Sequence, residues 1–245
     1  MQALATIRSL LRGVRCQINY FRFFSGVGLI ILSAVLGFTL DGWAYDLVKD
    51  AGGNSLWEIV AERLSFWGDF LTGTLPLCLG LWVMGYWLKR YQWQRTALAC
   101  LLAAFLAGGM VSAVRLTAGR TRPNATLENA KVRLGYEPRP IISFGRVLPD
   151  GKLIDGFYGI KRPAMFQAFP SGHAATSVAT AATLLVALPE IGIFIVPMAL
   201  GVCWSRMYLH QHHFSDVLVG AAVGLIVGLS FGRGARVEGE SPYAP

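Results

Sequence analysis

The sequence predicts an all-α fold: a six-transmembrane-helix bundle with a long exterior loop and an amphipathic N-terminal helix. Of its 245 residues, 54% are hydrophobic and only 15% are charged, a balance too apolar for an ordinary soluble domain. Apolar runs close to the roughly 20 residues that a membrane-crossing helix needs also recur along the chain. They occupy residues 24–40, 66–88, 96–117, 172–188, 191–208 and 217–231.

Residues 1–22 are expected to form a cytoplasmic amphipathic helix on the membrane surface, because their apolar side chains recur at helical spacing. A helix packed directly against the spans is the alternative interpretation. The apolar stripe contains Leu4, Ile7, Leu11, Val14, Ile18 and Phe21, and the arginines off it are Arg8, Arg12 and Arg15.

Charge sets the expected orientation in the membrane. The segments before the first span and between the second and third spans are basic and contain no acid, so the positive-inside rule places both in the cytoplasm. Acidic residues dominate the segment after the first span, which fits the exterior, and an even number of spans returns the C-terminus to the cytoplasm. The basic residues are Arg8, Arg12, Arg15, Arg22, Lys89, Arg90 and Arg95, and the acidic ones are Asp41, Asp46, Asp50, Glu58 and Glu62.

Residues 118–169 are expected to form the exterior loop, mostly irregular or in short hairpins, because glycine and proline recur throughout it. Asp150-Gly151 between two apolar pairs has the sequence of a hairpin turn. Residues 23–233 then make one six-span domain, and residues 234–245 are expected to be a disordered tail.

This loop is unusually basic for an exterior segment. From Arg115 to Arg162 the chain holds ten Lys or Arg and four Asp or Glu, which an anionic substrate or anionic lipid head groups would explain. We expect Lys161 and Arg162 to contact such head groups. A basic loop that is merely solvated is the alternative.

Glycine recurs at every fourth residue along the sixth expected span. Small residues at this spacing let two helices approach closely. The expected partner is another span of the same chain, and a homodimer contact is the alternative. The residues are Gly220, Gly224, Gly228 and Gly232.

Ionisable residues gather at the exterior ends of four expected spans. Such residues cost several kcal/mol at the edge of the hydrocarbon core unless they are paired or hydrated, so a functional site is the default interpretation. Helix bundles build sites from side chains that converge in this way. Arg115 and Arg122 lie at the end of the third span, His173 at the start of the fourth, Arg206 at the end of the fifth, and His212 and Asp216 at the start of the sixth.

These residue types suit phosphoryl transfer, in which arginine binds phosphate oxygens and histidine acts as nucleophile or general acid. Asp216 follows His212 at helical spacing, so it is expected to hold one imidazole nitrogen and leave the other free to attack phosphorus. His173 would protonate the departing oxygen. The phosphate oxygens would be bound by Arg115, Arg122 and Arg206 and by the backbone N–H groups of Ser171 and Gly172.

Three motifs in this order resemble those of the type 2 phosphatidic acid phosphatase superfamily of lipid phosphatases. The second and third motifs are intact, whereas in the first an arginine, Arg115, stands where the family has lysine. The resemblance implies a six-helix core, a nucleophilic His212, and neither a metal ion nor another cofactor. The matching residues are Arg115 with Arg122-Pro123, Pro170-Ser171-Gly172-His173, and Ser205-Arg206 with His212 and Asp216.

The expected function is hydrolysis of a lipid phosphate or diphosphate through a phosphohistidine, at the exterior or periplasmic face of a plasma or bacterial inner membrane. The expected partners are the substrate lipid and the bilayer, without nucleic acid. One alternative is a lipid phosphotransferase that uses the same phosphohistidine. Another is a membrane transporter or channel, which would place its charges near mid-span. A metal-binding tract at residues 210–213 is disfavoured, since no acidic or cysteine partner has metal-ligand spacing.

A cysteine at Gly151 tests the orientation. Because the loop is expected outside, Gly151→Cys should react with a membrane-impermeant thiol reagent in intact cells. Labelling only after lysis would invert the topology. The unsubstituted chain is the control, because its cysteines lie in the first basic segment or inside spans and predict neither a disulfide nor a zinc site: Cys16, Cys78, Cys100 and Cys203.

Overall fold

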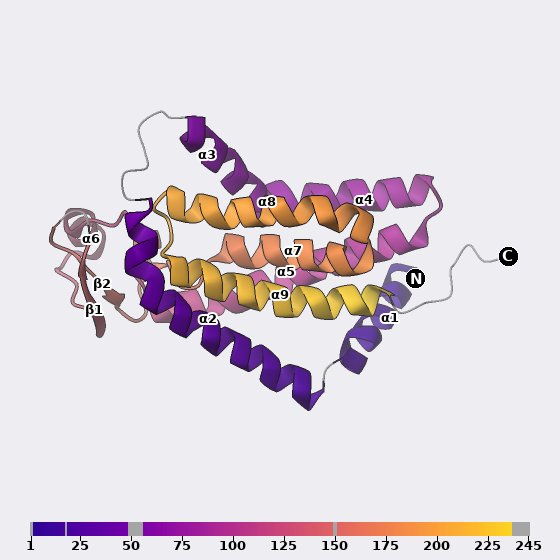
Figure 1. Cartoon of the computed structure of the whole chain (residues 1–245), viewed down its shortest axis with the longest axis horizontal. Helices are drawn as coiled ribbons and strands as arrows, with labels where there is room; N and C mark the ends of the chain where they lie inside the picture. The colour runs from indigo at the N-terminus through magenta and orange to yellow at the C-terminus, as the bar shows by residue number, and fades with distance from the viewer. Residues whose placement is uncertain (1, 18, 49–55, 149–150, 237–245) are drawn as a thin grey trace.

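The computed structural model describes residues 2–17, 19–48, 56–148 and 151–236 of the chain and is mostly helical (Figure 1). A bundle of long helices carries a small cap at one end, whereas α1 and the end of α9 lie at the opposite end. The elements are α1 (Gln2–Gln17), α2 (Tyr20–Asp46), α3 (Leu56–Gly68), the π-helix η1 (Phe70–Thr74), α4 (Leu75–Trp87), α5 (Tyr91–Ala118), α6 (Leu127–Leu134), β1 (Ile142–Val147), β2 (Ile154–Phe157), the 3-10 helix η2 (Ala164–Phe166), α7 (Gly172–Ala187), α8 (Pro189–Tyr208) and α9 (Phe214–Arg236).

Five helical segments among the described residues are long and apolar enough to cross a membrane: α2, η1 with α4, α5, α8 and α9. The chain is therefore an integral membrane protein. The sixth expected span, residues 172–188, corresponds to α7, which has only 16 residues. α7 packs against α5, α8 and α9 inside the bundle, so the count of six spans remains a prediction.

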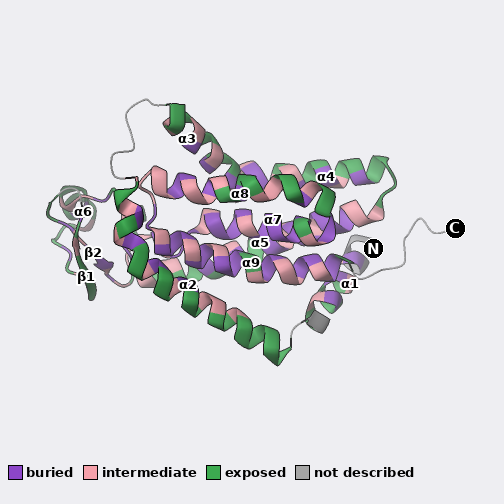
Figure 2. Ribbon diagram, viewed as in Figure 1, coloured by how far each residue is buried: buried purple, intermediate pink, exposed green. Residues whose placement is uncertain are grey.

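Helix α7 is buried on most sides, because its alanine and threonine side chains are short enough for neighbouring helices to approach. Figure 2 shows buried residues concentrated in α7 and α9, whereas the outer face of α2 is exposed. The exposed apolar side chains of α2, including Phe24, Ile31 and Val35, suit contact with lipid. The core joins α1, α5, α7 and α9 through Leu10, Ala103, Val111, Ala179, Val223 and Phe231.

The glycines of α9 face α7. A Cβ atom at Gly224 would lie 2.4 Å from the carbonyl oxygen of Ala175, and one at Gly228 would lie 2.5 Å from that of Ala179. These distances are shorter than any van der Waals contact, so a side chain here would force the two helices apart. The glycine stripe therefore packs against a helix of the same chain, as expected.

The second expected span is interrupted at Asp69. The apolar run at residues 66–88 was expected to be one helix, but α3 ends at Gly68 and the chain restarts as η1 and α4. Asp69 Oδ1 accepts a hydrogen bond from the backbone nitrogen of Leu71 (2.8 Å), which caps the new start. The break therefore places the carboxylate of Asp69 within an otherwise apolar stretch of the chain.

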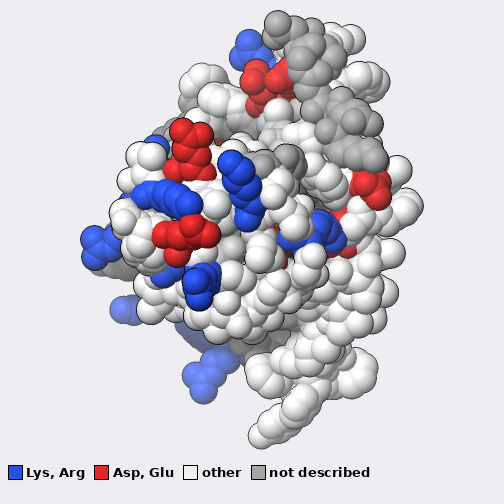
Figure 3. Space-filling view, turned by 90° about the vertical axis from the view of Figure 1, so that its left-hand side faces the viewer, with Lys and Arg blue, Asp and Glu red and all other residues white. Residues whose placement is uncertain are grey.

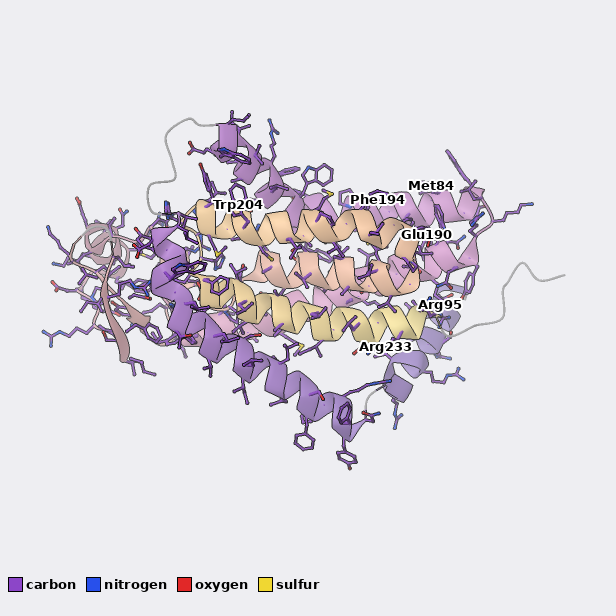
Figure 4. The ribbon with its side chains drawn as sticks, in the orientation of Figure 1. Met84, Arg95, Glu190, Phe194, Trp204 and Arg233 are labelled. Atoms are coloured by element: carbon purple, nitrogen blue, oxygen red, sulfur yellow. The ribbon has the colours of Figure 1, made fainter. Side chains whose placement is uncertain are left out.

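Arg95 joins three helices at the end of the bundle opposite the cap (Figure 4). Its buried guanidinium donates to the carbonyl oxygens of Gly234 (3.0 Å) and Ala235 (3.1 Å) and to Ser9 Oγ. These carbonyls end α9, where the helix dipole favours a cation. Because α9 continues to Arg236, the prediction of a disordered tail from residue 234 is wrong for its first residues. The remainder of that tail lies outside the described residues.

The N-terminal helix packs against the bundle through a face that matches the expected apolar stripe only in part. Thr6, Leu10 and Gly13 are buried, and Val14 of the stripe packs against the core, whereas Leu11 of the stripe is 49% exposed. This packing matches the alternative interpretation, a helix that lies directly on the spans. The predicted boundary after residue 22 lies inside α2, which already begins at Tyr20.

The cap is formed by the expected exterior loop, with α6, the β1–β2 hairpin and η2 inside it. The strands pair antiparallel with Val147 opposite Ile154, as the hairpin prediction required, and Asp150 of the predicted turn lies outside the described residues. Lys131 binds Glu137 at 2.6 Å on this surface. Seen from the cap, Lys and Arg are interspersed with Asp and Glu (Figure 3). Part of the basic surplus is therefore balanced locally.

Gly224→Ala should destabilise the protein by about 1–3 kcal/mol, because the added methyl group overlaps the carbonyl of Ala175. Thermal unfolding in detergent measures the effect. Gly28→Ala is the matched control, since a Cβ atom there meets nothing within 4 Å. Equal stability of the two variants would mean that α7 and α9 do not pack closely.

Candidate active site

Four helix ends meet beneath the cap. α5 and α8 end there, whereas α7 and α9 begin there (Figure 1). The predicted site residues lie in the last turns of the first pair, in the first turns of the second pair or in the adjoining connections. Helix N-termini direct unpaired N–H groups and a partial positive charge toward this point, which favours an anion.

Contacts join the predicted residues into one cluster. The backbone nitrogen of Ser171 donates to the carbonyl oxygen of Asp216 (2.9 Å), which ties the start of α7 to the start of α9. A Cβ atom at Gly172 would lie 3.3 Å from Arg115 Nη1, so glycine lets that guanidinium approach the N-terminus of α7. His212 joins the cluster through Asp216, with Nδ1 3.6 Å from Asp216 Oδ2.

Three arginines surround the cluster with unused donors. The Nε atoms of Arg115, Arg122 and Arg206 are buried and have no hydrogen-bond partner among the described residues. Their other nitrogens are held in place: Arg115 by Ser112 Oγ (3.2 Å), Arg122 by Gln211 and Arg206 by Ser65.

The arginines also crowd one another. Burial and the charge of Arg115 lower the pKa of Arg122. A buried donor without a partner costs about 1–3 kcal/mol. Phosphate oxygens would satisfy these donors and relieve the repulsion between the guanidinium groups.

His212 is almost fully buried, and its Nδ1 lies 2.8 Å from the carbonyl oxygen of Ala168. A carbonyl can only accept, so Nδ1 carries the proton and Nε2 keeps its lone pair. Asp216 was expected to accept this hydrogen bond. The carbonyl oxygen of Ala168 is the nearer acceptor, and Asp216 Oδ2 lies 3.6 Å from the same nitrogen, where its negative charge acts on the ring.

The imidazole of His212 is neutral at pH 7. Burial lowers its pKa to about 4, assisted by Arg206 and Arg122 and opposed by Asp216. A neutral ring with a free Nε2 is the form that can attack phosphorus. Asp216 would then stabilise the cation that forms on the ring after attack.

His173 stands in the first turn of α7 and lines a cavity of about 350 Å³ with Asp69, Arg115 and Gly172. Its ring is within electrostatic range of His212 and Arg206. The two histidines therefore share one site, but only His173 is among the residues that line this cavity. Lys161 Nζ donates a hydrogen bond to the hydroxyl oxygen of Tyr136 (2.9 Å). Neither Lys161 nor Arg162 lines the cavity.

Arg120 is the main residue that sequence reasoning missed. It is fully buried and binds three carboxylates: Asp216 Oδ1 at 2.7 Å, Asp41 Oδ2 at 2.8 Å, and Asp155 Oδ2 at 3.2 Å. Ser215 completes the cluster, since it receives a hydrogen bond from Arg120 and donates two to Asp41. The cluster lies directly behind His212 and fixes Asp216.

The surroundings of Arg120 keep it charged. Burial opposes ionisation, but Asp216, Asp155 and Asp41 outweigh it and raise the pKa of Arg120. The rings of Phe38 and Phe144 lie 5.0 Å from the guanidinium carbon, which adds cation–π attraction. In contrast, burial and the charge of Arg120 lower the pKa of His213, whose Nε2 lies 3.1 Å from the carbonyl oxygen of Thr121.

The sequence contained only a partial signal for this cluster. Arg120 lies between the two arginines of the first motif, which offered a hint of proximity. Asp41 was expected in the acidic exterior segment after the first span, but it lies inside α2 and is 3% exposed. The described residues contain no group of three or more His, Cys, Asp or Glu arranged to hold a metal ion.

Arg120→Met should lower the free energy of unfolding by about 3–5 kcal/mol, because it leaves three buried carboxylates without their cation. Arg120→Lys should lower the free energy of unfolding by less, since lysine keeps the positive charge but lacks the planar guanidinium that binds two carboxylates at once. Thermal unfolding in detergent measures both variants. Arg133→Met, which removes an exposed arginine of α6, is the control and should be near neutral. A stable Arg120→Met protein would contradict the structural role of the cluster.

A family model described as the PAP2 superfamily matches residues 96–234. A stretch of 72 residues, 29% of this chain, is 35% identical to the inositol phosphorylceramide synthase catalytic subunit aur1 of Schizosaccharomyces pombe, and it spans 17% of that protein's length.

Among solved structures, the chain is similar to a transmembrane PAP2-type phosphatidylglycerolphosphate phosphatase from Bacillus subtilis. The two share 16% sequence identity over 91% of this chain and 90% of that one, with a TM-score of 0.42. The family model covers more than half of the chain and includes each of the three motifs around the site. The chain therefore belongs to the PAP2 superfamily.

Proposed function

We propose that this protein is a membrane phosphatase that hydrolyses a lipid phosphate or diphosphate through a phosphohistidine intermediate. One observation carries the proposal: three buried arginine Nε donors without partners among the described residues belong to the same cluster as a neutral histidine whose Nε2 is free. This arrangement supplies an anion site and a nucleophile at the same place.

In the first step, His212 Nε2 attacks phosphorus and the bond from phosphorus to the leaving oxygen breaks. His173, protonated in the complex with the anionic substrate, gives its proton to that oxygen. Arg115, Arg122 and Arg206 neutralise the remaining phosphoryl oxygens, with N–H groups from the start of α7. Asp216 lies 3.6 Å from Nδ1 and stabilises the positive ring.

In the second step, water attacks the same phosphorus from the side that the alcohol has left. His173, now neutral, takes a proton from the water. The phosphorus–nitrogen bond breaks, phosphate departs and His212 returns to its neutral form. We propose that the arginines and helix N-termini supply the necessary charge stabilisation, so that the reaction needs no metal ion or other cofactor.

We propose that the site faces the exterior or periplasm. The basic segments before α2 and between α4 and α5 support a cytoplasmic position for the opposite end of the bundle. Arg95 and Arg233 are labelled at that opposite end in Figure 4, which supports the same orientation. Both termini would then be cytoplasmic.

A lipid phosphotransferase is the second candidate, because a 72-residue stretch of this chain is 35% identical to a synthase subunit of Schizosaccharomyces pombe. The two reactions share the phosphohistidine and differ only in the acceptor, water or a lipid hydroxyl. Adding a lipid alcohol to the assay distinguishes them by the appearance of a new phosphorylated lipid. A transporter is disfavoured, since the ionisable residues gather at helix ends.

His212→Ala should abolish phosphate release from a short-chain lipid phosphate, because it removes the ring nitrogen that attacks phosphorus. The purified variant should unfold at a temperature close to that of the wild type. The assay contains EDTA, in which wild-type activity should persist. His210→Ala is the matched control and should remain active. If His212→Ala kept more than a tenth of wild-type activity, His212 would not be the nucleophile. If the wild type lost activity in EDTA and a divalent ion restored it, the reaction would depend on a metal ion.

Lys161 and Arg162 are proposed to attract anionic head groups near the cap. Each exposed cation can contribute about 1 kcal/mol of attraction to an anionic lipid surface. Replacing both with glutamine should raise KM, more strongly at low salt, and leave kcat nearly unchanged. A large fall in kcat would instead place one of them on the transferring phosphoryl group. Arg133→Gln, which removes an exposed charge from α6, controls for net charge.

A further inference from the structure

Asp69 brings an acidic group into the cavity that holds His173, and the reaction steps above give it no role. Its Oδ1 caps η1, whereas Oδ2 has no hydrogen-bond or ion-pair partner among the described residues. The side chain is half-buried and lines the cavity together with Arg115, Gly172 and His173. Its charge acts on both His173 and Arg206.

The cavity lies on the leaving-group side of the site. Displacement at phosphorus proceeds in line, so the leaving oxygen departs opposite the attacking His212 and toward His173. His173 lines the cavity, and His212 is not among its lining residues. Phe70, Ala104 and Phe105 extend the lining between η1 and α5, where an apolar wall suits lipid chains.

We infer that Asp69 makes this site select phosphate monoesters of lipid alcohols over lipid diphosphates. This inference rests on the proposed phosphatase function and narrows its substrate class. Cleavage of a monoester releases an alcohol that carries no charge on the atoms next to the ester oxygen. Cleavage of a diphosphate at its outer phosphorus releases a phosphate monoester, whose anionic oxygens would lie beside the carboxylate of Asp69.

Repulsion between Asp69 and an anionic leaving group favours strong selection between the two substrates. Like charges brought together in a partly desolvated site change kcat/KM by roughly ten- to a thousand-fold. Arg115 lines the same cavity, but its charge serves the transferring phosphoryl group of either substrate and does not distinguish them. Asp69 is the acidic side chain among the lining residues, so the discrimination is assigned to it.

Two substrates and two charge-matched variants test this inference. The full chain, purified in detergent, is assayed with phosphatidic acid as the monoester and a polyprenyl diphosphate as the diphosphate. Asp69→Asn removes the charge but keeps an oxygen that can cap η1. Glu62→Gln removes an exposed acid of α3 outside the cavity and is the control. Asp69→Ser, which also retains a capping oxygen, serves if the asparagine variant fails to fold.

The wild type should prefer the monoester by at least about ten-fold in kcat/KM. Asp69→Asn should raise kcat/KM for the diphosphate about ten-fold or more and change that for the monoester by less than about three-fold, whereas Glu62→Gln should leave the ratio unchanged. An equal change in kcat/KM for both substrates, or a wild-type preference for the diphosphate, would overturn this inference but not the proposed function. Hydrolysis of neither substrate by the wild type would reject the proposed function, and the inference with it.

Discussion

The guanidinium of Arg120 binds carboxylates from three separate parts of the chain: Asp41 in α2, Asp155 in β2 and Asp216 in α9. All four side chains are buried, and each charge would be costly there without its partners. The cluster therefore ties the first long helix and the cap to the start of α9. Since His212 directly precedes that helix, the position of the nucleophile depends on these ion pairs.

The same cluster gives the site an internal electric field. The carboxylate of Asp216 lies on the Nδ1 side of His212, whereas Arg122 and Arg206 lie within electrostatic range of the ring. Together with the carbonyl oxygen of Ala168, this field favours the tautomer with a proton on Nδ1 and a lone pair on Nε2. The charge distribution is prepared before any substrate enters, which is how preorganised sites stabilise a transition state.

Local patterns in the sequence predicted the helices and most of the site residues. They did not predict which residues far apart in the chain form pairs. Hydropathy located the long helices, and the motif residues fell at helix ends that meet. No local pattern paired Arg120 with Asp41 and Asp155, because those contacts depend on how α2 and β2 fold back toward α9. Likewise, one carboxylate in an apolar run did not reveal that the chain breaks at Asp69.

The most direct test of this account is to capture the phosphoryl group on His212. Wild-type protein is mixed with a lipid phosphate carrying radioactive phosphorus and quenched within one turnover. A phosphohistidine at this position predicts a label that is stable in base, labile in acid, and recovered on the peptide that contains His212. Turnover without label on that peptide, or with label on another residue, would contradict it.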